Sequence, residues 1–494
     1  MCITSISTLL QGIIEVPSVF DVTIHGLKTD SRKVQPGDAF IALAGARTPA
    51  EHYMDQAISA GATAILLESE QERQCHERHG ALIVPVVGLR ARLGRIADRF
   101  FEHPSRHLRV IGVTGTNGKT SVTQYISQLL RETGTPCGLL GTLGYGMPGS
   151  IESATHTTPD VVQVNRVLNR IRNEGGRAAV MEVSSHALDQ GRVDNLTMTG
   201  AVFTNLTRDH LDYHGSMEAY GEAKAKLFLR EELHFSVINF DDPFGRQLYG
   251  QLEGQCDRVR YSLHEAQMEL WLKEFTPTAS GFRARVDGQW GEFDLTVPLL
   301  GSFNASNVLA ALATVLTLGV PVERAVSIVR ELSPPPGRLE RFTGSTGKHV
   351  VVDYAHTSDA LANALEALRP HTRGRLICVF GCGGDRDPGK RPEMAKEAEK
   401  RADYVIVTDD NPRTEQPERI VSDISAGFTQ AGRWQVIHDR AQAIAEALGM
   451  ANEDDLVLIA GKGHEAYQEI RGQKLPFSDA EQVRHLLNLN GGVA

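Results

Sequence analysis

The sequence has few cysteines, no long apolar run and no excess of positive charge. Its six cysteines are scattered and none form a C-x-x-C pair, which argues against a zinc ribbon or a disulfide framework. Cys378 and Cys382 flank the end of an apolar run, so we expect buried thiols there. No apolar run reaches the roughly 18 residues of a membrane span, and no signal peptide opens the chain. We therefore expect a cytoplasmic protein without a membrane span.

The net charge and the length of the chain narrow the possible classes of function. The formal net charge of −10 argues against general affinity for nucleic acid or anionic membranes. With 494 residues, 41% of them hydrophobic and 23% charged, the chain is typical of a globular protein with about three domains. We expect a monomer that has small molecules as its partners.

A glycine-rich segment at 112–121, Gly-Val-Thr-Gly-Thr-Asn-Gly-Lys-Thr-Ser, is the most informative stretch. It follows an apolar run that predicts a buried strand, and it precedes residues with helical spacing. Strand, glycine loop, Lys-Thr and helix form the usual cradle for a nucleotide phosphate. In this cradle Lys119 supplies a charge and Thr120 a ligand for Mg²⁺. The segment predicts ATP or GTP binding, although Val113 stands where the standard motif has glycine. The predicted nucleotide-binding residues of the loop are Thr114, Gly115, Thr116, Asn117, Gly118, Lys119 and Thr120.

Turn and linker signals divide the chain into three segments. In the first hundred residues, an expected helix at 53–60 precedes an expected strand at 62–67, which indicates a small α/β unit. A linker at 102–106 and the run of three prolines and a glycine at 334–337 mark the two boundaries. We expect domains at residues 1–100, 101–335 and 336–494.

Strands and helices alternate in both later segments, which predicts α/β domains with mostly parallel sheets. The expected strands are residues 178–183, 201–204 and 236–238, and then 349–352, 376–380, 404–407, 435–438 and 456–460. Polar clusters follow four strands of the last segment, at 353–356, 383–387, 409–413 and 461–465. Ligands of open α/β sheets bind beyond the carboxyl ends of the strands, so these clusters indicate a second binding face. The alternative is that they are ordinary polar loops.

Three features of the middle segment could carry chemistry. Glu182 ends an apolar strand, where a buried carboxylate requires a metal, a base or a paired Lys or Arg. The segment 205–214, Asn-Leu-Thr-Arg-Asp-His-Leu-Asp-Tyr-His, is rich in potential ligands, although each taken alone is typical of a surface loop. His210 is an unusual ligand for Mg²⁺, which prefers oxygen. Lys224 lies in a helical run at 216–228, and its position alone predicts a solvated surface lysine.

In ordered combination, these motifs resemble the ATP-dependent Mur ligases of peptidoglycan synthesis over nearly the whole chain. The motifs are Gly-Thr-Asn-Gly-Lys-Thr at 115–120, Met-Glu-Val-Ser-Ser-His at 181–186, the segment 205–214, Gly-Ser-Phe-Asn-Ala-Ser-Asn at 301–307, Pro-Gly-Arg at 336–338, Asp-Tyr-Ala-His at 353–356 and Asp-Asn-Pro-Arg at 410–413. The phosphate loop of the family also lacks the early glycine. The resemblance implies an N-terminal UDP-binding domain, a central P-loop ATPase-like domain and a C-terminal Rossmann-like domain that binds an amino acid.

The resemblance implies a ligase that forms an amide bond through an acyl phosphate. Lys119 would neutralise the γ-phosphate of ATP, and Thr120 would hold one Mg²⁺ ion. Glu182 and His210 would hold a second, and Lys224 would carry a carbamate derived from CO₂ near this metal. Further nucleotide contacts are implied at Asn304 and Asn307 near the adenine, Arg338 at the phosphates and Asp353 at the ribose.

The resemblance also implies two substrate sites and favours the diaminopimelate-adding branch of the family. The positions matching a site for UDP-N-acetylmuramoyl-L-Ala-D-Glu are Thr29, Ser31, Ala46, Arg47, Thr48, His156, Thr157, Thr158, Ser184, Gln190 and Arg192. Those matching an amino-acid site are Arg386, Asp410, Asn411, Pro412, Arg413, Gly461 and Glu465. Diaminopimelate has a far carboxylate that lysine lacks, and a forked arginine such as Arg413 suits it. Asp410 and Glu465 would receive ammonium groups, so we expect meso-diaminopimelate as the amino acid.

Alternative functions remain at this stage. The same chemistry with L-lysine is one, and another is a related ligase that adds D-glutamate, L-alanine or folate-linked glutamate. A nucleotide-driven switch belongs to a different class, but such a switch needs no amino-acid pocket and so leaves the second polar face unexplained.

Overall fold

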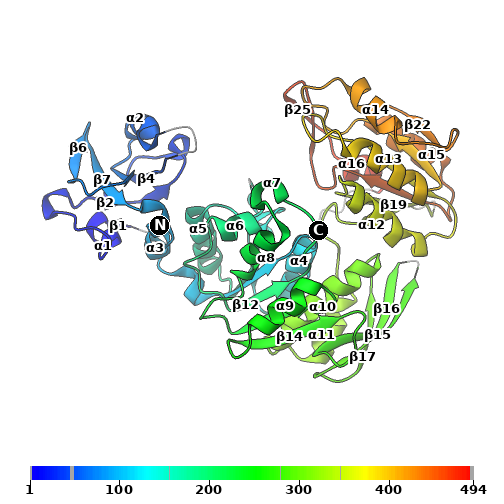
Figure 1. Cartoon of the computed structure of the whole chain (residues 1–494), viewed down its shortest axis with the longest axis horizontal. Coiled ribbons are helices and arrows are strands. Elements are labelled where there is room, and N and C mark those ends of the chain that lie inside the picture. The colour runs from blue at the N-terminus through cyan, green and yellow to red at the C-terminus, as the bar shows by residue number, and fades with distance from the viewer. Residues whose placement is uncertain (1–2, 45–48, 155, 279, 345–346, 490–494) are drawn as a thin grey trace. The chain divides into compact units, whose positions relative to one another are not determined.

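The computed structural model describes residues 3–44, 49–154, 156–278, 280–344 and 347–489. The chain divides into two compact units, residues 1–260 and 261–494. Figure 1 labels the elements of both units. Among the described residues, no helix is both long and apolar enough to cross a membrane.

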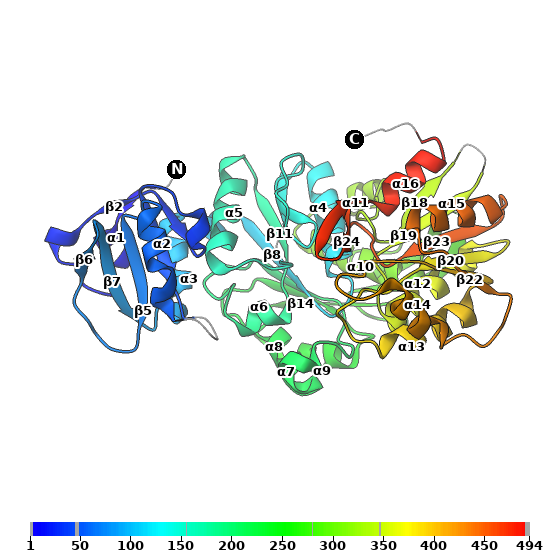
Figure 2. The same ribbon diagram turned by 90° about the horizontal axis from the view of Figure 1, so that it is seen from above.

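The first unit begins with a five-stranded sheet in the order β3-β4-β5-β7-β6, parallel except for the edge strand β6. Its elements are β1 (Thr4–Ser5), α1 (Ile6–Leu10), β2 (Thr23–Ile24), β3 (Gly26–Lys28), β4 (Asp38–Ala42), α2 (Met54–Ser59), β5 (Ala64–Ser69), β6 (His76–Arg78), β7 (Ala81–Val87) and α3 (Leu89–Phe100). Alternate strand residues pack against α1 and α3 on one face and α2 on the other. Figure 2 shows this small sheet with its helices, which confirms the expected α/β unit.

The rest of the first unit is built on parallel strands in the order β9-β11-β8-β12-β13, with β10 antiparallel at the edge. Its elements are β8 (Arg109–Thr114), α4 (Lys119–Glu132), β9 (Cys137–Gly141), β10 (Gly144–Gly146), α5 (Val161–Asn173), β11 (Ala178–Glu182), α6 (Ser185–Asp189), β12 (Gly200–Phe203), α7 (Leu211–His214), α8 (Met217–Ala225), β13 (Phe235–Asn239) and α9 (Pro243–Gln251). The expected strands are confirmed to within one residue at each end. Because β8 lies between β11 and β12, the carboxyl ends of these three strands meet at one edge of the sheet.

The second unit begins with a ribbon that the sequence analysis did not predict. Strand β14 (Asp257–Ser262) crosses the boundary between the two units. The elements after it are β15 (Leu270–Thr278), β16 (Gly281–Gly288), β17 (Phe293–Val297), α10 (Ser302–Thr317) and α11 (Val322–Val329). Strands β15, β16 and β17 are antiparallel. Most residues of β15 are exposed or half-buried, so the strand lacks the apolar run that marks a buried strand in a sequence.

The last part of the second unit is a six-stranded sheet in the order β18-β19-β23-β20-β21-β22, parallel except for β18. Its elements are β18 (Glu340–Thr343), β19 (His349–Asp353), α12 (Ser358–Leu368), β20 (Leu376–Phe380), α13 (Lys390–Arg401), β21 (Tyr404–Val407), α14 (Pro417–Ser425), β22 (Trp434–Val436), α15 (Arg440–Met450), β23 (Leu456–Ala460), β24 (Tyr467–Ile470), β25 (Gln473–Pro476) and α16 (Asp479–Leu486). Helices α12, α13 and α14 cover one face, and α15 and α16 cover the other.

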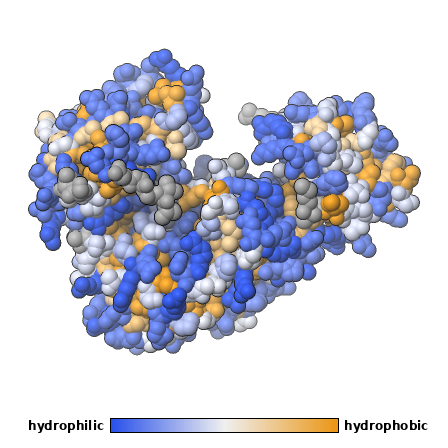
Figure 3. Space-filling model, turned by 180° about the vertical axis from the view of Figure 1, so that it is seen from behind, coloured by the Kyte–Doolittle hydropathy of each residue, from blue (hydrophilic) through white to orange (hydrophobic). Residues whose placement is uncertain are grey.

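All five strands expected in this last part are present, and only β22 ends two residues before its predicted limit. Cys378 and Cys382 are buried as predicted, and burial raises the pKa of both thiols to about 12. On the face of the molecule in Figure 3, apolar residues are scattered among polar ones.

Candidate functional site

The glycine loop connects β8 to α4, and the side chain of Lys119 folds back onto the loop backbone. Gly115 and Gly118 have positive φ angles of 150° and 85°. Lys119 Nζ donates to the carbonyl oxygens of Gly115 at 2.8 Å and Thr116 at 2.9 Å. The N-terminus of α4 and an ammonium group therefore lie at the same loop, which is the arrangement that binds phosphate.

The carboxyl end of β12 braces this loop from one side. Thr204 Oγ1 donates to the carbonyl oxygen of Asn117 at 2.6 Å, and the side-chain oxygen of Asn205 accepts from the backbone N–H of Asn117 at 2.9 Å. A Cβ atom at Gly115 would lie 1.9 Å from Thr204 Oγ1, so this position requires glycine for space as well as for its φ angle. The sequence analysis placed Thr204 at the end of an expected strand and Asn205 at the start of the segment 205–214, but nothing in either pattern assigned them this bracing role.

Glu182 is 2% exposed at the end of β11, beside the first turn of α4. Its carboxylate accepts from Thr120 Oγ1 at 3.0 Å, from the backbone N–H of Thr142 at 2.8 Å and from Thr142 Oγ1 at 3.2 Å. Among the described residues no Lys or Arg pairs with it, so the expected alternative of a core ion pair is wrong. Hydroxyl and carboxylate oxygens side by side are donors of the kind Mg²⁺ prefers.

Lys224 is buried, which corrects the prediction of a solvated surface lysine. The side chain on α8 is 1% exposed, and Nζ donates to the carbonyl oxygen of Gly115 at 3.0 Å. The ammonium also lies 4.4 Å from the ring centroid of Tyr220. Burial, reinforced by the positive charge of Lys119, lowers the pKa of Lys224 well below its ordinary value. The helical pattern of residues 216–228 gave no sign that this face packs on the phosphate loop.

The ligand-rich segment 205–214 forms a half-exposed cluster around α7. The ring of His210 lies 4.9 Å from that of His186, and His210 Nε2 lies 3.5 Å from a carboxylate oxygen of Asp209. His214 Nε2 is 2.9 Å from Ser185 Oγ, and its ring stacks on Tyr220. In the described parts of the chain, no group of three His, Cys, Asp or Glu side chains could hold a metal by itself. A metal role for His210 therefore stays a prediction.

Four of the predicted substrate positions form one hydrogen-bonded network beside Glu182. Thr158 Oγ1 donates to the backbone oxygen of Glu182 at 2.8 Å and accepts from the backbone N–H of Ser184 at 3.0 Å. Arg192 donates to the backbone oxygen of Thr158 at 2.7 Å and to the side-chain oxygen of Gln190 at 2.6 Å. The fold thus brings these residues together next to the buried carboxylate.

Two neighbouring positions join the same region. Thr157 Oγ1 lies 3.2 Å from Thr142 Oγ1, which also reaches Glu182. His156 is exposed, and its backbone is held by the Tyr145 hydroxyl, which donates to its carbonyl oxygen.

Thr29 and Ser31 follow strand β3 of the first sheet. Thr29 Oγ1 donates to Asp160, the N-cap of α5, at 3.3 Å, and Ser31 Oγ donates to Gln56 at 2.8 Å. Thr29 is thus brought to the middle segment, whereas Ser31 is buried and bonded to α2 of the same small α/β unit. The predicted positions Ala46, Arg47 and Thr48 lie outside the described residues.

Four predicted nucleotide contacts belong to the second unit. Asp353 ends β19 and accepts from the backbone N–H groups of Leu339 at 2.8 Å and Ala355 at 2.9 Å. The Arg338 guanidinium lies 4.9 Å from the ring centroid of Tyr354, which follows Asp353. Arg338 and Asp353 therefore share one region at the start of the last sheet. The other two contacts, Asn304 and Asn307, are buried on α10, where Asn307 Nδ2 donates to Asn304 Oδ1 at 3.2 Å.

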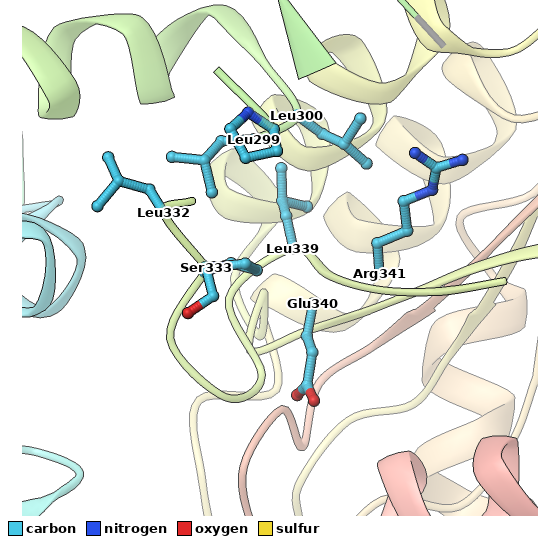
Figure 4. A pocket seen from close by; sticks show the side chains of 9 residues that line it. Leu299, Leu300, Leu332, Ser333, Leu339, Glu340 and Arg341 are labelled. Atoms are coloured by element: carbon cyan, nitrogen blue, oxygen red, sulfur yellow. The ribbon is translucent and has the colours of Figure 1, made fainter. Parts of the chain in front are cut away.

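A small pocket lies beside the linker that precedes this sheet. It has a volume of about 340 Å³ and is lined by Pro298, Leu299, Leu300, Leu332, Ser333, Pro334, Leu339, Glu340 and Arg341. Figure 4 shows leucine side chains gathered on one side of the pocket, with the carboxylate of Glu340 pointing away from them. None of its lining residues is a predicted site residue.

The predicted amino-acid site is a dense polar cluster after β21 and β23. The Asn411 amide donates to Glu465 Oε2 at 2.8 Å, and its oxygen accepts from Lys462 Nζ at 3.1 Å and from the backbone N–H of Glu469 at 2.9 Å. Gly461 lies against Asp410, because a Cβ atom there would be 2.6 Å from Asp410 Oδ2. The fold thus brings the clusters at 409–413 and 461–465 together.

Arg413 and Arg386 differ in how they are held. Arg413 Nη1 donates to the carbonyl oxygen of Gly384 at 2.7 Å, and its Nε lies 3.4 Å from Glu469 Oε2. Arg386 is exposed on the neighbouring loop, and Pro412 is buried. The sequence analysis included Lys462 in the polar cluster at 461–465 without giving it a role, and it missed Glu469; both residues contact predicted site residues.

The fold and the loop define an α/β protein with a phosphate-binding loop in one unit and a second polar face at the carboxyl edge of another parallel sheet. Three family models match the chain in succession: the Mur ligase family catalytic domain at residues 23–101, the Mur ligase middle domain at 113–315 and the Mur ligase glutamate ligase domain at 337–463. The chain belongs to the Mur ligase family.

Comparison with individual relatives shows which members of the family the chain resembles. The chain is 50% identical over 466 residues to a protein of Ectopseudomonas mendocina named UDP-N-acetylmuramoyl-L-alanyl-D-glutamate–2,6-diaminopimelate ligase, covering 94% of this chain and 95% of that protein. It is also 50% identical to the protein of the same name from Pseudomonas aeruginosa, covering 94% of this chain and 96% of that protein. A solved structure of a ligase with this name aligns with a TM-score of 0.73 and 37% identity, covering 98% of this chain and 99% of that one.

Proposed function

We propose that the chain is an ATP-dependent ligase that adds meso-2,6-diaminopimelate to UDP-N-acetylmuramoyl-L-alanyl-D-glutamate during synthesis of the peptidoglycan precursor. The observation that carries this proposal is 50% identity over nearly the full length to relatives named for this reaction. The local chemistry supports it, because a phosphate loop with a buried carboxylate suits activation and the Asn411 cluster suits an amino acid.

The proposed reaction has two steps. The D-glutamate carboxylate attacks the γ-phosphorus of ATP, ADP leaves, and an acyl phosphate forms. The amine of diaminopimelate then attacks the acyl carbon, and phosphate leaves from the tetrahedral intermediate. Phosphoryl transfer needs positioning and charge neutralisation more than covalent help from the protein. In this chain Lys119 and the amide groups at the start of α4 would supply that neutralisation.

We propose that Thr120, Glu182, His210 and a carbamate on Lys224 serve two Mg²⁺ ions. Thr120 Oγ1 and the Glu182 carboxylate are 3.0 Å apart, and these oxygens fit a metal that shares its remaining positions with phosphates and water. When bound, Mg²⁺ offsets the negative charge of the phosphate groups. Glu182 is preorganised by Thr142, so the protein would not reorient this carboxylate on binding.

The surroundings of Lys224 favour its carbamylation. A neutral amine attacks CO₂, forming an N–C bond and releasing a proton, and the product is an anion. Burial lowers the pKa of Lys224 and so populates the neutral amine. The nitrogen of a carbamate keeps one hydrogen, which suffices for the present bond to the Gly115 oxygen. A carbamate would attract a metal near Glu182, whereas an ammonium group would repel it.

A substitution tests the carbamate. Lys224→Ala should lose most activity, and acetate should restore part of it by supplying the missing carboxylate. The matched control is Lys226→Ala, because Lys226 follows two residues later but is half-exposed and pairs with Asp189. Full activity of Lys224→Ala would remove the carbamate from the mechanism.

The UDP-linked substrate would bind through the Thr158 network and the N-terminal sheet. Thr158, Ser184, Gln190 and Arg192 are already hydrogen-bonded beside Glu182, where the D-glutamate carboxylate must arrive. We assign residues 1–100 to the UDP moiety, 101–335 to ATP and 336–494 to diaminopimelate. Because ATP and UDP-linked sugars are made in the cytoplasm, we place the reaction there, and we expect a monomer.

Phosphate release tests the overall proposal. Release should require ATP, the UDP-linked dipeptide and diaminopimelate together, and L-lysine or ornithine should replace diaminopimelate poorly. Equal turnover with L-lysine would contradict the assigned amino acid. ATP hydrolysis unaffected by either substrate would instead favour a nucleotide-driven switch.

A further inference from the structure

Lys462 is a buried cation inside the amino-acid cluster, and the proposed mechanism gives it no task. It follows β23 and is 0% exposed. Its Nζ donates to Glu465 Oε2 at 3.0 Å and to Asn411 Oδ1 at 3.1 Å, and it lies 5.6 Å from the ring centroid of Tyr467. A buried ammonium is costly unless it is paired, and these contacts supply the carboxylate and amide oxygens that pair with it.

The ammonium group fixes the orientation of Asn411. Asn411 Oδ1 accepts from Lys462 Nζ and from the backbone N–H of Glu469, so its Nδ2 must face the other way, towards Glu465 Oε2. The amide therefore joins the loop after β21, the loop after β23 and the first strand of the β24–β25 hairpin.

The same ammonium leaves one oxygen of Glu465 available. Both donors, Lys462 Nζ and Asn411 Nδ2, approach Oε2. Within the described parts of the chain, no hydrogen bond reaches Oε1, and the side chain of Glu465 is 19% exposed. A carboxylate fixed through one oxygen presents the other in a defined direction, as recognition of an ammonium group requires.

We propose that Lys462 is a positioning residue for the amino-acid substrate. It fixes Glu465 through Oε2 and Asn411 through Oδ1, so that Glu465 Oε1 receives an ammonium group of diaminopimelate. Lys462 itself does not touch the substrate, because its side chain is fully buried. This proposal rests on the proposed ligase function and assigns to Lys462 an effect on amino-acid binding alone.

Steady-state kinetics of four single variants and one double variant test the proposal. Lys462→Met keeps the length of the side chain but removes its charge and donors. We expect the KM for diaminopimelate to rise about tenfold or more, with kcat and the KM values for ATP and the UDP-linked dipeptide within about twofold of wild type. Lys462→Gln keeps a donor without charge and should have an intermediate KM, and it replaces the Met variant if that one does not fold. The control is Lys348→Met, which removes a lysine at the amino end of β19 that is bonded to the Leu448 carbonyl oxygen, and it should leave every KM unchanged.

A double-mutant cycle separates positioning from general destabilisation. If Lys462 acts through Glu465, Lys462→Met combined with Glu465→Gln should raise the KM for diaminopimelate no further than Glu465→Gln alone. Multiplying effects, an equal rise in the KM for ATP, or an unchanged KM in both Lys462 variants would overturn the proposal. The wild-type enzyme tests the function separately, since a wild type whose phosphate release ignores diaminopimelate refutes the ligase assignment whatever the variants do.

Discussion

Gly141 ends β9 against the carboxylate of Glu182, and adding one methyl group there displaces that carboxylate without changing any charge. A Cβ atom at Gly141 would lie 2.3 Å from Glu182 Oε1. Its φ angle is not in the left-handed region, so alanine can adopt the backbone conformation of the strand. The substitution Gly141→Ala is therefore a steric probe of Glu182, which supplies the three atoms nearest to that Cβ.

The expected loss of stability can be estimated from the hydrogen bonds that Glu182 loses. To restore van der Waals contact, Oε1 has to move by about 1 Å, which breaks its 2.8 Å bond from the Thr142 N–H. Losing one hydrogen bond to a charged group costs about 2 kcal/mol, and we expect the free energy of unfolding to fall by that amount. If Glu182 holds Mg²⁺ as proposed, moving its carboxylate out of its supporting bonds should raise the Mg²⁺ concentration for half-maximal activity by about tenfold or more.

Two measurements check this prediction. Chemical denaturation gives the free energy of unfolding, and phosphate release over a range of Mg²⁺ concentrations gives the metal requirement. The matched control is Gly250→Ala on α9, where a Cβ atom meets open space and alanine favours the helix. An unchanged Mg²⁺ requirement in a stable Gly141→Ala protein would refute the role given to Glu182.

Three further predictions concern the second unit. Arg440→Met should lower the free energy of unfolding by about 3–5 kcal/mol, because it leaves the Asp479 carboxylate buried without its partner, and the double variant Arg440→Met with Asp479→Leu should recover most of that loss in the same denaturation experiment. Burial lowers the pKa of His371, so the unfolded chain takes up its proton first as the pH falls below about 6.5. Stability should therefore fall with decreasing pH in that range, and His371→Ala should show a shallower dependence in melting curves. Arg413→Ala should reduce the preference for diaminopimelate over L-lysine by at least about tenfold in competition assays, and unchanged selectivity would contradict its role.

The sequence predicted the strands of the parallel sheets well, because each strand is visible as a short run of neighbouring residues. Strands such as β20 and β23 are continuous apolar runs between polar loops, and a chain can bury such runs on both faces only in a covered parallel sheet. The phosphate loop was also predictable, because two glycines with positive φ and a Lys-Thr pair at a helix start leave few other uses. The ribbon β15–β17 was not, because its strands carry charged pairs such as Lys273 with Asp287 on an exposed face.

Site residues could be predicted where they belong to a sequence motif. They could not be predicted where only tertiary packing brings them to the site. Thr142 binds Glu182 from a position 40 residues earlier in the chain, and no pattern links the two. Thr204 determines why Gly115 is glycine, but only the pairing of β12 with β8 brings them together. Burial of a lysine is likewise a property of the packed structure, and position in a helix gave the wrong answer for Lys224.

Lys224 and Lys462, both buried, show why burial alone does not define the role of a lysine. Lys224 has a carbonyl oxygen and a tyrosine ring as neighbours, and among the described residues no carboxylate lies within salt-bridge distance. Without a counter-charge, and with Lys119 nearby, burial favours the neutral amine, which is the form that can react with CO₂. Lys462 is equally buried but lies 3.0 Å from Glu465, so it has a carboxylate partner that it can hold in place. The counter-ion therefore decides between a reactive amine and a positioning cation. A change in the CO₂ concentration should therefore alter the activity, because that activity depends on a carbamate at Lys224. The same change should leave the KM for diaminopimelate unaltered, because that KM depends on Lys462.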